Sequence, residues 1–71
     1  MSKQDFEVAF QEVLADETND YDCLSENARV VARWMIENEI GREDGVAIIE
    51  GEEAQFTVDE YYDYFNSTYQ N

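Results

Sequence analysis

The chain contains no histidine and no proline, one cysteine, three glycines and only 4 lysines and arginines among its 71 residues. Histidine is the commonest general base and transition-metal ligand, so its absence argues against an enzyme and against a bound metal. A single cysteine, Cys23, cannot form an internal disulfide. No charged leader and no run of 18 apolar residues indicates export or membrane insertion. We therefore expect a cytoplasmic, non-enzymatic protein without cofactor or metal.

Acidic residues dominate the charge of the chain, because 18 Asp and Glu face 4 Lys and Arg and give a formal net charge of −14 at pH 7. This balance argues against direct binding to nucleic acid or to an anionic membrane surface. The chain is nevertheless 44% hydrophobic and 14% aromatic, whereas disordered acidic tails contain few aromatic residues. With 71 residues, it has room for one small core. The composition indicates one folded acidic domain.

Three segments have the periodicity of amphipathic helices, and a Ser or Thr suited to capping the first turn stands at or just before the start of each of them. They span residues 3–15, 25–40 and 58–69. Residues 16–24 have no apolar period and many turn-forming side chains, which predicts an acidic loop.

A β-hairpin is predicted over residues 46–57, where two apolar runs, 46–50 and 54–57, flank Gly51 and two glutamates. The order helix, helix, hairpin, helix is typical of the α+β class in a single small domain. The scaling of size with chain length predicts a radius of gyration of about 11 Å and a globule of about 28 Å across.

The apolar faces of these helices predict the core. Val30 and Trp34 lie off the main stripe of the second helix, and burial on two sides is the favoured explanation over a patch for a partner. Tyr64 lies off the face of the third helix that we expect in the core, and is a candidate for an interface. Cys23 is expected to be a small packing residue. The expected core face of the third helix consists of Tyr61, Tyr62, Phe65 and Tyr69.

The excess of acid lies in the outer parts of the chain, because Arg29, Arg33 and Arg42 balance the acids of residues 25–42. A net charge of −14 exceeds the roughly 2–8 usual for a small domain, and self-repulsion opposes it, so solubility alone does not explain it. On a globule of the expected size, the net charge per unit length approaches that of duplex DNA, which carries one charge per ~1.7 Å of helix axis.

We therefore predict that the outer acids imitate phosphates and occupy the basic groove of a nucleic-acid-binding protein. The first candidate cluster consists of Asp16, Glu17, Asp20 and Asp22. The second, with a tyrosine as a possible anchor, consists of Glu50, Glu52, Glu53, Asp59, Glu60, Asp63 and Tyr64. The first cluster alternates oxygen ligands as a calcium loop does, but Tyr21 and Asn27 replace the glycine and the glutamate that such a loop needs.

In size, charge and aromatic content, the whole chain resembles the small acidic proteins with which phages and plasmids inhibit restriction or CRISPR systems. Many of these act as DNA mimics, so the resemblance implies a stoichiometric inhibitor. The alternative is an adaptor or inhibitor that binds a partner through Trp34 and a Tyr-rich apolar surface, with the acidity incidental. A homodimer through Val30, Trp34 and Tyr64 would enlarge either surface.

Overall fold

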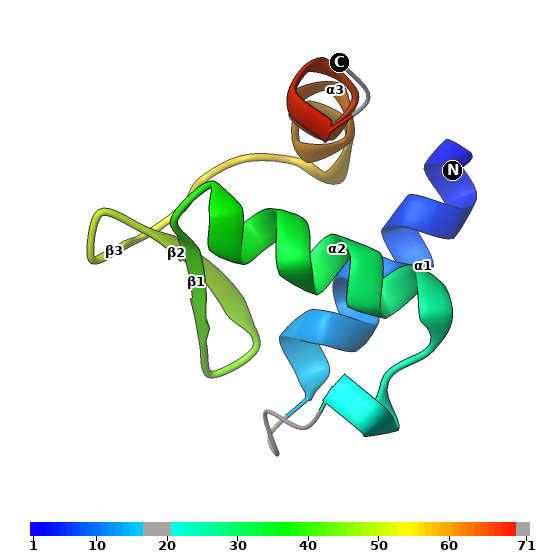
Figure 1. The fold of residues 1–71 in the computed structure, drawn as a ribbon. Coiled ribbons are helices and arrows are strands. Elements are labelled where there is room, and N and C mark those ends of the chain that lie inside the picture. The colour runs from blue at the N-terminus through cyan, green and yellow to red at the C-terminus, as the bar shows by residue number, and fades with distance from the viewer. Residues whose placement is uncertain (17–20, 70–71) are drawn as a thin grey trace.

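Residues 1–16 and 21–69, which this computed structural model describes, form three α-helices, a short 3-10 helix and a three-stranded antiparallel sheet (Figure 1). The helices are α1 (Lys3–Ala15), η1 (Tyr21–Cys23), α2 (Glu26–Glu37) and α3 (Val58–Tyr69). The strands are β1 (Ile40–Glu43), β2 (Val46–Ile49) and β3 (Glu52–Glu53). The predicted α+β class and the order helix, helix, hairpin, helix are confirmed.

The helix boundaries follow the capping residues. Ser2 Oγ accepts a hydrogen bond from the Asp5 backbone N–H at 3.2 Å, and Ser25 Oγ accepts one from Ala28 at the same distance. The predicted first and third helices, 3–15 and 58–69, are confirmed. The second is wrong at its end, because α2 stops at Glu37 and the chain turns through the left-handed backbone of Glu39 (φ 58°) into β1.

The predicted hairpin has the wrong strands. β2 pairs on one side with β1, from Ile40 opposite Ile49, and on the other side with β3. Residues 54–57 form no strand and instead lead to α3. The reason lies in two turns, Asp44-Gly45 and Glu50-Gly51, in which all four residues have positive φ. Two-residue turns of this kind match the twist of the flanking strands and set the register at β1–β2 and at β2–β3.

The core is an aromatic cluster between the helices. The Phe6 ring, fully buried, lies 5.1–6.0 Å from the rings of Phe65, Tyr62, Phe10 and Trp34, measured between centroids. Figure 1 shows α2 crossing α1, with α3 on one side and the sheet at the C-terminal end of α2. Ile40 and Ala47 carry the core into the sheet; its other members are Ala9, Val13, Leu24, Ala28, Val31, Ala32, Met35 and Tyr61.

The expected burial is confirmed for most but not all residues. Trp34, 1% exposed, and the α3 residues Tyr61 and Phe65 are buried, and Tyr62 is half-buried. Tyr69 is 46% exposed, because it stacks on the outside of the core against Phe65. Cys23 is exposed in η1, so the prediction that it is a small packing residue is wrong.

The size of the molecule agrees with the expectation from chain length. Its radius of gyration is 11.1 Å and its extents are 29 × 27 × 19 Å. No helix in the described part of the chain is long and apolar enough to cross a membrane.

Candidate interaction surface

The carboxylates lie almost entirely at the surface: every described Asp and Glu is exposed except Glu12 and Asp16, which are half-buried. Glu12 Oε2 accepts a hydrogen bond of 2.6 Å from the Ser25 backbone N–H and so supports the start of α2. Arg42 donates to Asp16 Oδ2 at 3.3 Å and to the carbonyl of Val13, which places a cation at the C-terminal end of α1. These two acids therefore have structural roles.

The first candidate cluster is only partly available to a partner. The Asp16 side chain is 9% exposed and its carboxylate is paired with Arg42, because the α1 terminus and β1 meet there. Asp22 is exposed in η1, and its backbone carbonyl accepts a hydrogen bond from Arg29 Nη2 at 3.4 Å. Glu17 and Asp20 lie outside the described residues.

The α3 acids of the second candidate cluster have different surroundings. Asp59 forms an ion pair with Lys3 of α1, and the lysine pKa is raised by this hydrogen bond and charge. Glu60 Oε1 accepts hydrogen bonds from the Thr57 N–H and hydroxyl at 3.3 and 3.2 Å, which completes the capping box. Asp63 is exposed on the same helix. One of the three is thus paired with a base, one caps its helix, and Asp63 faces solvent.

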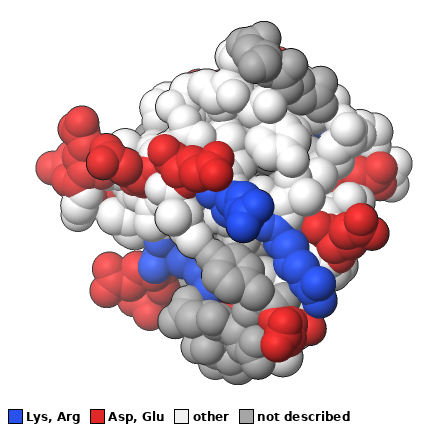
Figure 2. All heavy atoms as spheres, viewed as in Figure 1, with Lys and Arg blue, Asp and Glu red and all other residues white. Residues whose placement is uncertain are grey.

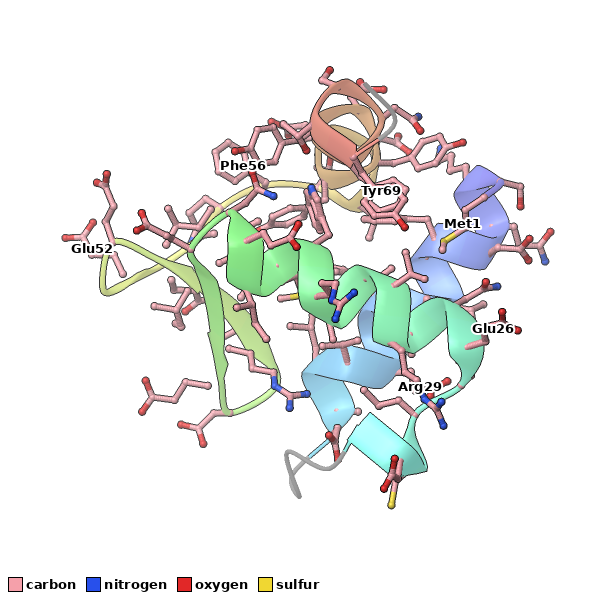
Figure 3. The ribbon with its side chains drawn as sticks, viewed as in Figure 1. Met1, Glu26, Arg29, Glu52, Phe56 and Tyr69 are labelled. Atoms are coloured by element: carbon pink, nitrogen blue, oxygen red, sulfur yellow. The ribbon has the colours of Figure 1, made fainter. Side chains whose placement is uncertain are left out.

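The remaining acids of the second candidate cluster are Glu50, Glu52 and Glu53, which we call the sheet acidic cluster. All three are exposed at the β2–β3 turn, and Figure 3 shows Glu52 pointing into solvent at the end of the sheet. Glu52 lies opposite Ile49 and Glu53 opposite Ile48, so the two glutamates occupy opposite faces of the sheet. Sequence reasoning did not select Glu43 and Asp44, which are exposed at the β1–β2 turn; the Asp44-Gly45 pair is the signal that marks this turn.

Basic residues gather on one face of the molecule. Figure 2 shows Lys and Arg atoms in the middle of the face that α2 presents, with groups of Asp and Glu around it and over the sheet. Arg29 Nε also donates to the Leu24 carbonyl at 3.2 Å, so its guanidinium lies against the turn that precedes α2. The sheet, whose exposed turns carry acids, is the more negative end of this view.

An apolar groove of about 390 Å³ lies between the sheet and α3. Tyr64 donates from its hydroxyl to Asn38 Oδ1 at 3.1 Å, which joins α3 to the end of α2 at one side of the groove. Phe56, 53% exposed, lies in the connecting segment (Figure 3). Its ring meets the Tyr61 ring edge-on, with 5.7 Å between the centroids. The lining consists of Asn38, Ile40, Ile49, Phe56, Glu60, Tyr61 and Tyr64. Of these, sequence reasoning selected Glu60 and Tyr64 as site residues.

The predicted apolar contact residues separate into buried and exposed ones. Trp34 is buried and donates from Nε1 to Thr68 Oγ1 at 2.7 Å, so it cannot serve as an interface residue in the alternative function or in a homodimer. Val30 is half-buried. Tyr64 is 44% exposed, with its ring 5.6 Å from that of Trp34, and it remains available at the surface.

Tyr61 has the one buried side-chain polar atom that lacks a hydrogen-bond partner among the described residues, its hydroxyl. Burial, and to a lesser extent the charge of Glu60, raise the pKa of this phenol. An unpaired buried hydroxyl costs about 1–3 kcal/mol, so Tyr61→Phe should raise the free energy of unfolding at pH 7 by about 1 kcal/mol. Thermal unfolding measures this change. If Tyr61→Phe instead melts at a lower temperature than the unchanged protein, the Tyr61 hydroxyl has a hydrogen-bond partner.

The same substitution should change the alkaline limb of stability. The pKa of Tyr61 is higher in the folded protein than in the unfolded chain. The stability that its protonated phenol contributes is therefore fully present below about pH 10 and is lost as the pH rises further. The stability of Tyr61→Phe should therefore fall less steeply above about pH 10 than that of the unchanged protein. Equal slopes for both proteins would contradict this contribution.

The described residues contain no group of three or more His, Cys, Asp or Glu side chains placed to hold a metal ion. Residues 17–20 of the loop considered as a calcium site lie outside the described residues. What the structure offers is an acidic end at the sheet beside an apolar groove. A comparison with known protein families, with curated proteins and with solved structures found no match.

Proposed function

We propose that the protein is a cytoplasmic, non-enzymatic inhibitor that occupies the basic nucleic-acid groove of a partner protein by imitating the charge of duplex DNA. The observation that supports this is the density of exposed carboxylates. A 29 Å length of duplex, the longest extent of the molecule, carries about 17 charges at ~1.7 Å per charge, and the chain carries a net charge of −14. Arginines and lysines that bind phosphates would meet carboxylates at a similar density.

The placement of acids at unfavourable backbone positions also supports the proposal. The non-glycine residues with positive φ among the described residues are all acidic, namely Glu39, Asp44 and Glu50. Asp44 is common at its position in an Asp-Gly turn, but glycine or asparagine is the usual choice at the positions of Glu39 and Glu50, where the left-handed region costs about 1–2 kcal/mol. Glu39 and Glu37 additionally lie at the C-terminal end of α2, where a negative charge opposes the helix dipole. Local strain of this kind is typical of residues retained for function.

Glu39→Gly should therefore raise the stability of the fold by about 1 kcal/mol, which is about 4–8 °C in melting temperature for a domain of this size. Relief of the left-handed backbone and of the charge at the helix end exceeds the entropy that glycine adds to the unfolded chain. The matched control is Glu7→Gly, inside α1, which should lose about 1 kcal/mol. A gain from both variants, or from neither, would contradict the role of the Glu39 backbone.

The proposal is tested by binding to the immobilised protein. A nuclease-treated bacterial lysate is passed over it and eluted with a salt gradient, and duplex DNA of about 20 base pairs is added as a competitor. Nucleic-acid-binding proteins that leave at moderate salt and are displaced by the duplex would support mimicry, because screening weakens exposed ion pairs. Retention through high salt without competition by DNA would instead favour the alternative, an apolar interface with incidental acidity.

A further inference from the structure

The groove between the sheet and α3 has the composition of a binding site for an apolar side chain. Its floor and walls include Ile40 and Ile49 from the sheet and the rings of Phe56, Tyr61 and Tyr64. Phe56 and Tyr64 expose 53% and 44% of their surface although the core lies directly beneath them. Apolar, aromatic-lined hollows with a few polar groups are typical of binding sites.

The rim of the groove is negative. Glu60 lines the groove itself, and a neighbouring hollow that shares Asn38 and Ile49 is lined also by Glu39 and Glu50. No Lys or Arg is among the described residues that line either hollow. The charge that complements this rim is therefore positive. A second copy of the chain would bring the same acidic rim against its own, which opposes self-association here.

We propose that this groove receives an apolar side chain that a partner protein presents between lysines or arginines. The basic residues meet Glu39, Glu50 and Glu60 while the apolar side chain lies against Phe56 and Tyr64. This inference rests on the proposed function and adds to it a short-range anchor, which selects among basic surfaces that the long-range field alone does not distinguish.

Two synthetic peptides test the anchor separately from the charge: acetyl-Lys-Lys-Phe-Lys-Lys-amide and the same peptide with serine in the central position. Binding is followed by the fluorescence of Trp34, the single tryptophan, whose ring lies 5.6 Å from Tyr64, and by amide chemical shifts. We expect the Phe peptide to bind about tenfold more tightly than the Ser peptide at equal salt, because it alone buries an aromatic side chain. Shifts should centre on the groove residues.

The variant Phe56→Gln should abolish this tenfold ratio, and Val8→Gln, which replaces an apolar residue 61% exposed on α1, should keep it. A peptide with glycines in place of the lysines should bind more weakly than the Phe peptide. Equal binding of the Phe and Ser peptides would overturn the groove proposal and leave charge mimicry standing, while binding of neither would overturn both. A dimer in sedimentation that is lost in Phe56→Gln would also overturn it, since a second copy would then fill the groove.

Discussion

Reversal of the sheet acidic cluster, with Glu50→Lys, Glu52→Lys and Glu53→Lys combined, should weaken binding to a basic nucleic-acid-binding partner by about 100-fold. Each exposed pair contributes up to about 1 kcal/mol, and each reversal replaces an attraction by a repulsion of similar size. The three residues lie around a two-residue turn at the edge of the sheet, where they are exposed and contribute nothing to the core. The variant should therefore fold, which far-ultraviolet circular dichroism checks.

The matched control for this variant is Glu7→Lys, Glu26→Lys and Glu37→Lys combined, on α1 and α2. Three reversals of two charge units each take the net charge from −14 to −8 in both variants, so long-range attraction is reduced equally. Each variant is immobilised, and the retention of lysate proteins on it and the salt dependence of that retention are compared. If the sheet acts as a contact, the sheet variant loses far more binding than the control. Equal losses would show that only the net charge matters.

The helices could be predicted from the sequence because the information that forms them is local. Ser2 reaches the N–H of Asp5, and Thr57 and Glu60 bond to each other, so both helix starts are specified within four residues. The strands could not be predicted in the same way. β1 contains a glycine and an arginine without apolar alternation, and β3 consists of two glutamates, which have low strand propensity. The left-handed turns that precede β2 and β3 override these preferences.

The exposure of the acids follows from their number, but their partners depend on tertiary structure. Arg42 meets Asp16 across 26 positions of sequence, which removes from the surface an acid that sequence reasoning assigned to the interface. The groove arises in the same way, because its residues come from the end of α2, the sheet, the connecting segment and α3. The apolar run 54–57 predicts a strand for Phe56, but Phe56 lines the groove. The sequence signal for its position is an apolar residue directly before the Thr57 capping box.

Phe6→Ala should lower the free energy of unfolding by about 3–5 kcal/mol and sharply lower the melting temperature. The ring is fully buried and contacts four other rings, and removal of a buried Phe costs about 3–5 kcal/mol. A domain of 71 residues has a stability of roughly 4–10 kcal/mol in total, so the loss is a large part of it. The control is Val8→Ala, 61% exposed on the same helix, which should change stability by no more than about 0.5 kcal/mol. Circular dichroism with heating measures both.

Salt should restore part of the helical signal of Phe6→Ala, because a Debye length of about 10 Å at 0.1 M salt screens the repulsion among the carboxylates of the folded state. A melting temperature equal to that of Val8→Ala would contradict the central role of the aromatic cluster. Phe6 is fully buried in the core, so its replacement by Ala removes no exposed side chain and no carboxylate. Under the proposed charge mimicry, the immobilised Phe6→Ala variant should nevertheless retain less of the lysate proteins, since its acids would match a phosphate pattern only while the packed rings hold the helices and the sheet in place.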